Sequence, residues 1–309
     1  MPGEVACIGG SFVDELFYTT HEILLATTNL ATVTKTAGGV SRNIAHQLAL
    51  LNVPVQLISV FGNDRDGAWL KEISSEAGVN LEASLTIDGF SGKYTGIINK
   101  DGTLFTGILT NQLTQLITPE HLELHKELLG AASWILADTN TSTESIEWLL
   151  IFSKQTGIPL IIEPVSVPPA AKLKRIELKG LYLITPNEDE LPALCSEKAL
   201  TREQQVGELL SRGARFVWLH NGKEGSVLYS ASGAITLEAP PVEVIDCTGA
   251  GDASVSGFIL GKQLGMEDID CLKLAHTLSL EVLKEKGAIS KQLDQKKLLS
   301  LVSKYYPHK

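Results

Sequence analysis

The stretch Val244-Ile245-Asp246-Cys247-Thr248-Gly249-Ala250-Gly251-Asp252 decides the fold, and Ala253–Gly261 follows it without a charged residue. This order indicates a strand end, a glycine turn and a helix that is apolar enough to be buried. The backbone amides of Gly249, Ala250 and Gly251 are then expected at the helix N-terminus, where small residues and the helix dipole favour a bound anion. The segment therefore predicts a phosphate-binding turn.

Asp252 stands at this predicted anion site, where its charge would repel a phosphate group. A carboxylate in that place is useful if it accepts a proton from an attacking hydroxyl group. The alternative is an ordinary acidic residue that stabilises the first turn of a helix. Because the whole stretch leads from a glycine turn into an apolar helix, we interpret Asp252 as a catalytic base.

Short apolar runs alternate with helical patterns along the 309 residues. The alternation predicts an α/β fold with a doubly wound, mostly parallel sheet and helices on both faces. The strands are expected at Val5–Ile8, Val55–Val60, Trp134–Ala137, Leu160–Ile162, Leu181–Ile184 and Phe216–Leu219. Amphipathic helices are expected at Ser41–Leu51, Pro119–Leu129 and Ser142–Phe152, the last two after a Thr or Ser cap.

Two segments break this rhythm, because Leu30–Thr36 and Lys93–Thr106 read as strands without an intervening helix. The second contains Asn99-Lys100-Asp101-Gly102, which is typical of a hairpin turn. These strands form either a small sheet that projects from the main body or edge strands of the main sheet, and periodicity does not decide between the two. We find no internal repeat or long linker, so we expect one domain over residues 1–309.

The charge and the cysteines exclude several classes of protein. With 26 basic and 36 acidic residues, the net charge is −10 and no basic run is present, which argues against a nucleic-acid partner. No apolar stretch approaches the length that spans a membrane. The four cysteines form no Cys-x-x-Cys pair, so we expect reduced, mostly buried thiols in a cytoplasmic protein.

The stretch from Asp246 to Asp252 resembles the Asp-Thr-x-Gly-Ala-Gly-Asp signature of the ribokinase-like family of sugar and nucleoside kinases, with Cys247 in place of the usual Thr. The chain has no P-loop motif, so it is not a P-loop kinase. Further segments resemble the family in the same order along the chain: Gly9–Asp14, Gly38–Asn43, Val60–Gly67, Thr185–Glu190 and Leu219–Gly225. The resemblance implies an ATP-dependent kinase that phosphorylates a primary hydroxyl group.

The resemblance also implies the role of each site residue. Asp252 would act as the base, with the amides of Gly249, Ala250 and Gly251 around the transferred phosphoryl group. The acceptor would contact Asp14, Gly38, Gly39 and Asn43. The nucleotide would contact Asn187, Gly222, Gly225, Thr248 and His276. His276 stands where relatives often have an Asn beside the adenine. Glu190 would order Mg²⁺ through water, and Asp246 would lie beside a monovalent cation such as K⁺. The strands within about 15–37 and 88–108 would form a lid, which in this family is often a homodimer interface.

Two of these motifs also have plain structural readings. Asn187 and Glu190 are able to serve as a helix cap and a solvated side chain, and a single diglycine is usually only a turn. Gly222 and Gly225 are able to close an ordinary hairpin.

Within the family, three segments resemble pseudouridine kinases, which phosphorylate the ribose 5′-hydroxyl: Gly38–Ala45, Ala137–Asn140 and Glu163–Ser166. Asp138 and Asn140 offer the donors and acceptors that a uracil ring requires. The alternative is that both residues only cap the helix that begins near Ser142, in which case ribose, another furanose sugar or adenosine becomes the expected acceptor.

Two rival functions lie outside this family. A dinucleotide-dependent oxidoreductase is disfavoured because its glycine turn should follow the first strand, whereas this one lies near the C-terminus. A non-catalytic nucleotide-binding protein is disfavoured because Asp252 is present.

Overall fold

A central sheet of eight strands organises the computed structural model, which describes residues 3–196 and 201–307. The strand order is β14-β13-β12-β11-β10-β9-β1-β4. Neighbouring strands from β4 to β12 pair in parallel, whereas β13 and β14 add an antiparallel edge. The strands are β1 (Val5–Ile8), β4 (Val55–Ile58), β9 (Trp134–Asp138), β10 (Leu160–Glu163), β11 (Leu181–Ile184), β12 (Phe216–His220), β13 (Ser226–Ser230) and β14 (Gly233–Leu237). The predicted mostly parallel sheet is confirmed.

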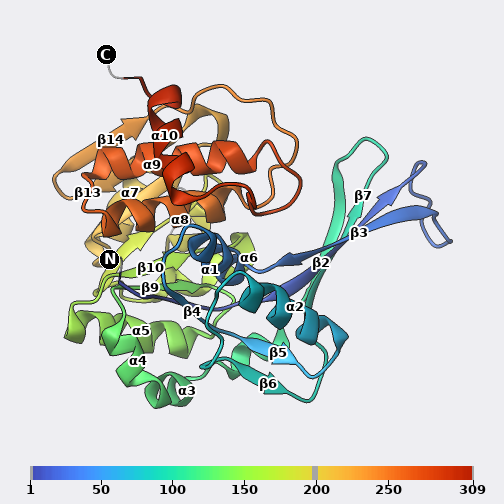
Figure 1. The fold of residues 1–309 in the computed structure, drawn as a ribbon, viewed down its shortest axis with the longest axis horizontal. Coiled ribbons are helices and arrows are strands. Elements are labelled where there is room, and N and C mark those ends of the chain that lie inside the picture. The colour runs from blue at the N-terminus through green and yellow to red at the C-terminus, as the bar shows by residue number, and fades with distance from the viewer. Residues whose placement is uncertain (1–2, 197–200, 308–309) are drawn as a thin grey trace.

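Helices cover both faces of this sheet, as Figure 1 shows. Val5 and Cys7 of β1 belong to one buried cluster and Ala6 and Ile8 to the other, because successive strand side chains point to opposite faces. The first cluster includes residues of α1 (Val40–Leu50), α2 (Arg65–Glu76), α8 (Ala250–Gln263), α9 (Asp268–Val282) and α10 (Gln295–Tyr305). The second includes residues of α3 (Pro119–Leu124), α4 (Lys126–Ala131), α5 (Thr143–Thr156), α6 (Val167–Ala170) and α7 (Arg202–Ser211).

A second sheet, with four strands among the described residues, extends away from the central one (Figure 1). We call it the projecting sheet; its order is β3-β2-β7-β8, with β2 (Phe12–Thr19), β3 (Ala31–Gly38), β7 (Gly92–Ile98) and β8 (Leu104–Thr110). The β7–β8 hairpin turns where the sequence predicts, and the Asn99 N–H donates to the Thr103 carbonyl oxygen at 2.8 Å. The extra strands therefore form a sheet of their own and are not edge strands of the central sheet.

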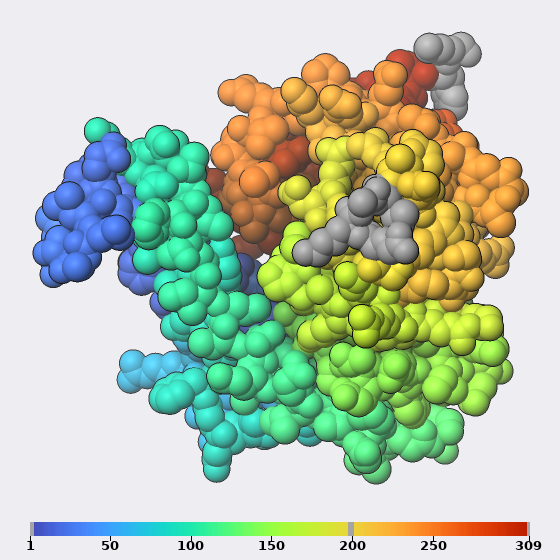
Figure 2. Space-filling view, turned by 180° about the vertical axis from the view of Figure 1, so that it is seen from behind, coloured from blue at the N-terminus to red at the C-terminus, as the bar shows by residue number. Residues whose placement is uncertain are grey.

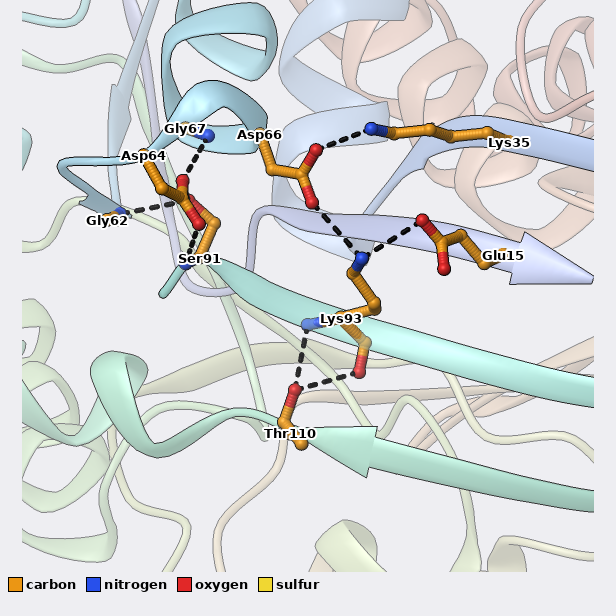
Figure 3. A network of polar contacts seen from close by, with 9 residues as sticks. All are labelled: Glu15, Lys35, Gly62, Asp64, Asp66, Gly67, Ser91, Lys93 and Thr110. Atoms are coloured by element: carbon orange, nitrogen blue, oxygen red, sulfur yellow. Dashed lines mark hydrogen bonds and ion pairs between the residues drawn. The ribbon is translucent and has the colours of Figure 1, made fainter. Parts of the chain in front are cut away.

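Charged side chains tie the projecting sheet to helix α2, as Figure 3 shows. The Nζ atom of Lys93 on β7 lies 2.9 Å from Glu15 Oε1 on β2 and 3.2 Å from Asp66 Oδ2 on α2. Lys35 on β3 pairs with the same Asp66. Each of these partly exposed pairs contributes little to stability by itself. Together they join three strands of the projecting sheet to one carboxylate of the main body.

Two predicted elements are divided in the structure. A single helix over Pro119–Leu129 is wrong, because His125, with φ −106° and ψ 18°, interrupts it between α3 and α4. The run Val55–Val60 divides at Ser59, whose Oγ donates to the Gly9 carbonyl oxygen at 2.7 Å. Beyond Ser59 the chain forms β5 (Val60–Gly62), which pairs with β6 (Leu85–Ile87) in a small separate sheet.

The segment before the glycine turn is a loop, not the predicted strand end. Val244 and Ile245 are exposed, and the Ile245 N–H donates to the Leu283 carbonyl oxygen at 2.8 Å, outside any sheet. The single-turn helices η1 (Gln112–Leu116), η2 (Ala171–Arg175), η3 (Leu191–Leu194) and η4 (Gly222–Glu224) complete the described elements.

Helix α8 is the apolar helix that the sequence predicts after the glycine turn. Its residues 252–261 are buried, and it packs closely on α9. A Cβ atom added at Gly257 would lie 2.7 Å from the Ala275 Cα, which shows how near the two backbones come. No helix in residues 3–196 or 201–307 is both long and apolar enough to cross a membrane.

Candidate active site

Polar residues gather at one edge of the central sheet, beyond the carboxyl ends of its parallel strands. Asp138 ends β9, Glu163 ends the adjacent β10, and Asn187 follows the next strand, β11. Ligands of open α/β sheets bind at this edge. Figure 2 shows the molecule hollowed between the projecting sheet and the C-terminal part of the chain. We therefore place the candidate active site here.

The glycine turn forms the N-terminus of α8, as predicted. Gly249 precedes the helix with φ 76°, and a Cβ atom there would lie 2.4 Å from the Ala288 Cα. Both the backbone conformation and the close contact therefore require glycine. At Gly251 an added Cβ atom would meet no other part of the described chain within 4 Å. The turn therefore borders open space beside the Cα atom of Gly251.

Asp252 lies in the first turn of α8 and is 8% exposed. Its Oδ2 accepts a hydrogen bond from Asn43 Nδ2 at 2.7 Å. Burial raises the pKa of Asp252 to about 7, although the Asn43 hydrogen bond and the charge of Arg42 act to lower it. A carboxylate with a pKa near neutrality is suited to accept a proton at physiological pH. The structure thus brings together Asp252 and Asn43, which are 209 positions apart in the sequence.

Asp14 lies on β2 of the projecting sheet. A Cβ atom added at Gly38 would come 2.1 Å from the Asp14 carboxylate, so glycine leaves room for this side chain. Burial raises the pKa of Asp14 to about 6, and the nearby Arg42 opposes the increase. Gly39, with φ 94°, precedes helix α1, which carries Asn43. The predicted acceptor residues therefore meet where the projecting sheet joins α1.

Asp138 is fully buried and joins the turn after β9 to the loop after β1 and to the first turn of α1. Its Oδ2 accepts from the backbone N–H groups of Gly10 (2.9 Å) and Ser41 (3.0 Å), and its Oδ1 accepts from that of Asn140 (2.9 Å). Both carboxylate oxygens already accept backbone N–H groups, so we replace the predicted contact with a base by a structural role. The predicted alternative is also wrong for Asp138, because Ser142 caps α5.

The backbone of Asn140 is firmly held, whereas its side chain bonds to nothing in the described chain. The Asn140 carbonyl oxygen accepts from Thr114 Oγ1 (3.1 Å) and Gln115 Nε2 (3.0 Å), and Lys172 Nζ donates to the preceding Thr139 carbonyl at 2.9 Å. The side chain is nearly fully buried, yet neither Nδ2 nor Oδ1 has a partner. Buried amides normally have hydrogen-bond partners, so this one is suited to a ligand.

Buried acids surround Asp252 on the side of β10 and β11. Burial raises the pKa of Glu163 well above its usual range, and the charges of Glu190 and Asp252 raise it further. Glu190 is 5% exposed, so the solvated alternative is wrong for it. Asn187 Oδ1 accepts from the Glu190 N–H at 2.9 Å, and the Asn187 N–H donates to Glu190 Oε2 at 3.0 Å. Asn187 therefore caps the local turn, which is the structural role that the sequence analysis gave as its alternative.

Oxygen ligands of this kind suit Mg²⁺, a hard cation that usually keeps several waters. Glu163 and Glu190 are the residues that would hold it, because their carboxyl groups lie near each other beyond the ends of β10 and β11. In the described part of the chain, no three His, Cys, Asp or Glu side chains converge on one metal position. The remaining ligands would have to be water or phosphate, and the contact of Glu190 with Mg²⁺ through water stays a prediction.

Gly222 and Gly225 close the β12–β13 hairpin, so the plain alternative is confirmed for them. The Asn221 N–H donates to the Gly225 carbonyl oxygen at 2.9 Å across this turn. Gly225 has φ 101°, and a Cβ atom there would lie 2.1 Å from the Leu237 carbonyl oxygen. The hairpin follows the carboxyl end of β12, at the same sheet edge as Asn187. Contact with a nucleotide stays a prediction for both glycines.

His276 lies inside the protein and not beside an open base site. Its Nε2 is 2.8 Å from Ser226 Oγ, and its Nδ1 is 2.8 Å from the Tyr306 hydroxyl. Trp218 Nε1 donates to the same serine at 2.8 Å. Burial lowers the pKa of His276 to about 4. Because both ring nitrogens are engaged, we withdraw the expected adenine contact; His276 instead joins α9 to β13 and to Tyr306 after α10.

Asp246 joins the loop before the glycine turn to the loop after α9. Its Oδ1 accepts from the Thr248 N–H (2.9 Å) and Oγ1 (2.7 Å), and its Oδ2 accepts from the Gly287 N–H (2.9 Å). The nucleotide contact of Thr248 and the monovalent cation at Asp246 stay predictions. The cysteines agree with the sequence: all four are free, and only Cys247, in this loop, is exposed.

Arg42 and Glu163 belong to the site although they were not among the predicted site residues. Glu163 ends a parallel strand at the ligand-binding edge, and this position in the sequence could have identified it as a site residue. Arg42 is a charged residue among the buried positions of α1, where a cation requires partners. Those partners come from distant segments, and the sequence does not indicate them.

The comparisons with known proteins agree with this geometry. The family model described as pfkB family carbohydrate kinase matches residues 3–296. The pseudouridine kinase of Escherichia coli (strain K12) is 29% identical over 304 residues, covering 96% of each chain. The guanosine-inosine kinase of Exiguobacterium acetylicum is 25% identical, covering 94% of this chain and 98% of the other. The structure of Arabidopsis thaliana ribokinase complexed with ribose and ATP superposes with a TM-score of 0.86 at 24% identity, covering 97% and 98% of the two chains, which shows the same fold.

Proposed function

The chain belongs to the pfkB family of carbohydrate kinases and is a phosphotransferase with a hydroxyl acceptor, and from this premise we propose that it phosphorylates pseudouridine. The donor is ATP, and the product is pseudouridine 5′-phosphate. The observation that carries the proposal is the buried Asp252 beside the open glycine turn, in contact with Asn43. A non-catalytic protein would have no use for a buried acid at an anion site.

In the proposed reaction, Asp252 accepts the proton of the ribose 5′-hydroxyl group. The 5′-oxygen attacks the γ-phosphorus of ATP, the bond to the β-γ bridging oxygen breaks, and ADP leaves. The amides of Gly249, Ala250 and Gly251 donate to the transferred group and stabilise its charge. Glu163 and Glu190 would hold Mg²⁺, which would neutralise the phosphate charges when bound.

The acceptor lies between α1 and the projecting sheet in this proposal. Asp14 and Asn43 hold the ribose hydroxyl groups, while Gly38 and Gly39 let the sugar approach the backbone. The projecting sheet acts as a lid that excludes water, and a second copy of the chain pairs through it. The four free cysteines fit a cytoplasmic enzyme.

Pseudouridine is favoured by two independent observations. The Escherichia coli relative named as a pseudouridine kinase aligns over 96% of each chain. Asn140 also presents a buried amide without a partner, which is the kind of group that reads a base edge. Ribose or another furanose sugar is the second candidate, because Asp138, the other expected base contact, is occupied by backbone amides.

A substrate panel tests the proposal. The purified protein with ATP and Mg²⁺ is given pseudouridine, uridine, adenosine, ribose and fructose 6-phosphate in turn, and kcat/KM is measured with the product identified by mass. We expect pseudouridine to be the best acceptor. If ribose or adenosine exceeds it, the nucleoside assignment is wrong while the kinase assignment stands.

Asp252→Asn tests the catalytic base in the same assay. The variant keeps the shape of the side chain and should lower turnover by roughly 10²–10⁴-fold, the usual contribution of general base catalysis. ATP binding, measured by calorimetry, should be little changed. Turnover within a few-fold of the wild-type value would remove Asp252 from this role.

A further inference from the structure

Arg42 is a buried cation at the centre of the site, with a relative exposure of 1%. Its Nε donates to the Gly38 carbonyl oxygen at 3.1 Å, and its Nη2 donates to the Ala37 carbonyl oxygen at 2.8 Å. Its Nη1 lies 3.2 Å from His46 Nδ1, and Nη2 also donates to Asn43 Oδ1. These hydrogen bonds therefore fix the position and orientation of the guanidinium group.

These contacts determine which way the Asn43 amide faces. An amide has one accepting oxygen and one donating nitrogen, and Arg42 is able only to donate. The Asn43 oxygen therefore turns toward Arg42, and its NH₂ group turns toward Asp252, to which it donates at 2.7 Å. The reverse orientation would place an oxygen against the carboxylate of Asp252 and an NH₂ group against a cation.

Two carboxylates also act on the charge of Arg42. Burial lowers the pKa of Arg42 to about 10, and the charges of Asp14 and Asp252 oppose this decrease. His46 adds no charge at neutral pH, because burial and the nearby Arg42 lower its pKa to about 4. A buried cation is stable only when such partners surround it. Arg42 is thus the cation that the two acids share.

We propose that Arg42 is a positioning residue for phosphoryl transfer: it holds the Asn43 amide in the orientation that Asp252 requires and supplies the positive charge that keeps Asp252 ionised. The inference rests on the proposed function, in which Asp252 accepts the proton. Arg42 has no role in proton transfer itself. Its contacts with Ala37 and Gly38, the last residues of β3, also tie this arrangement to the root of the projecting sheet.

The charged groups around Asp252 fix the expected direction of the pH effect. Asp14 and Asp138 raise its pKa, and Glu163 is a further acid beside it, so Arg42 is the cation that opposes them. An opposite charge within a few ångströms shifts the pKa of a carboxyl group by about 1–3 units. Removal of Arg42 should therefore move the acid limb of the activity profile upward.

The test compares Arg42→Met and Arg42→Lys by kcat and kcat/KM from pH 5 to pH 10. For Arg42→Met we expect the acid limb to move up by about one pH unit or more, with a lower plateau. For Arg42→Lys we expect the limb to stay near the wild-type position, because the charge remains. Its plateau should fall roughly 10–100-fold, because a lysine is unable to hold the amide and both carbonyl groups at once.

Arg212 provides the matched control, because it is also a partly buried arginine that holds backbone carbonyl groups. Its Nε donates to the Ile176 carbonyl at 3.1 Å and its Nη1 to the Leu194 carbonyl at 2.8 Å, away from Asp252. Arg212→Lys should lower the unfolding temperature without moving the acid limb or changing the plateau by more than a few-fold.

The proposal is overturned if Arg42→Lys keeps the wild-type plateau, or if Arg42→Met folds and keeps both the limb and the plateau. Should Arg42→Met fail to fold, the plateau of Arg42→Lys decides alone. Failure of the proposed function is a separate result: Asp252→Asn would then retain turnover. Loss of turnover in Asp252→Asn, with normal Arg42 variants, would contradict only the inference about Arg42.

Discussion

Replacing Asn140 with leucine should separate base recognition from folding. Leucine has a similar size and offers no hydrogen bonds, whereas the Asn140 amide lies buried with both its polar atoms unpartnered in the described chain. The backbone around it is held by Thr114, Gln115 and Lys172, and none of these bonds involves the side chain that is replaced. The variant therefore removes ligand contacts and leaves the local framework intact.

The expected loss can be worked out from the two atoms. If Nδ2 and Oδ1 each make one hydrogen bond to a uracil edge, and each bond contributes about 0.5–1.5 kcal/mol, the total is about 1–3 kcal/mol. That corresponds to a loss of roughly 5- to 150-fold in kcat/KM for pseudouridine. Ribose, which has no base, should lose almost nothing. Without ligand, the unfolding temperature should be no lower than that of the wild type, because a buried amide without partners does not stabilise the fold.

Ser142→Ala is the control, because it should lower stability without changing acceptor preference. Ser142 caps α5 by accepting a hydrogen bond from the Ser145 N–H at 3.2 Å. Its loss should cost about 0.5–2 kcal/mol of stability and leave the preference for pseudouridine over ribose unchanged. Both variants are measured by kcat/KM for the two acceptors and by thermal unfolding. Equal losses for pseudouridine and ribose in Asn140→Leu, or a clear drop in its unfolding temperature, would refute the assignment.

Three further outcomes are expected. The kcat/KM of the wild type should fall as the pH drops below about 7, because the raised pKa of Asp252 leaves it protonated there; a limb near pH 4 in the pH–rate profile would point to another base. Gly251→Val should lower turnover by roughly 10²–10³-fold, with little change in unfolding temperature because an added Cβ atom meets open space. Gly249→Ala, in contrast, should destabilise the fold. Normal turnover by Gly251→Val would mean that the turn does not hold phosphate. Asp66→Asn removes the partner of both Lys35 and Lys93, so hydrogen exchange in β3 and β7 should become faster in the free protein, and equal exchange would exclude a fastening role for Asp66.

The buried strands of the central sheet were predictable because their environment leaves few choices. A parallel strand covered on both faces reads as a nearly continuous apolar run, so β1 and β11 are found with the predicted bounds. The edge strands β13 and β14 escaped the same reasoning, because they contain serine and glycine and are only partly buried. The break at His125 was not predicted either, because the helical spacing of apolar residues continues past this residue although its backbone is not helical.

The candidate site was predictable where one local segment contains all the required chemistry. The glycine turn and Asp252 are contiguous, and the N-terminus of a helix after a glycine turn follows from sequence alone. Asp138 and His276 depend instead on distant partners. The three N–H groups that bind Asp138 come from three segments, and His276 meets a serine 50 positions away. Such contacts exist only after the sheet has brought the segments together.

The acids of the site are costly to ionise in the free protein. Burial raises the pKa of every one of five carboxyl groups at this edge: Asp14, Asp138, Glu163, Glu190 and Asp252. The charge of Arg42 interacts with two of them, Asp14 and Asp252. Each ionised carboxylate therefore costs stability in the free protein, and a nucleotide without its cation would meet further repulsion. A divalent cation that enters with the nucleotide supplies the opposite charge, so the arrangement that destabilises the free site is the one that favours the metal-nucleotide complex.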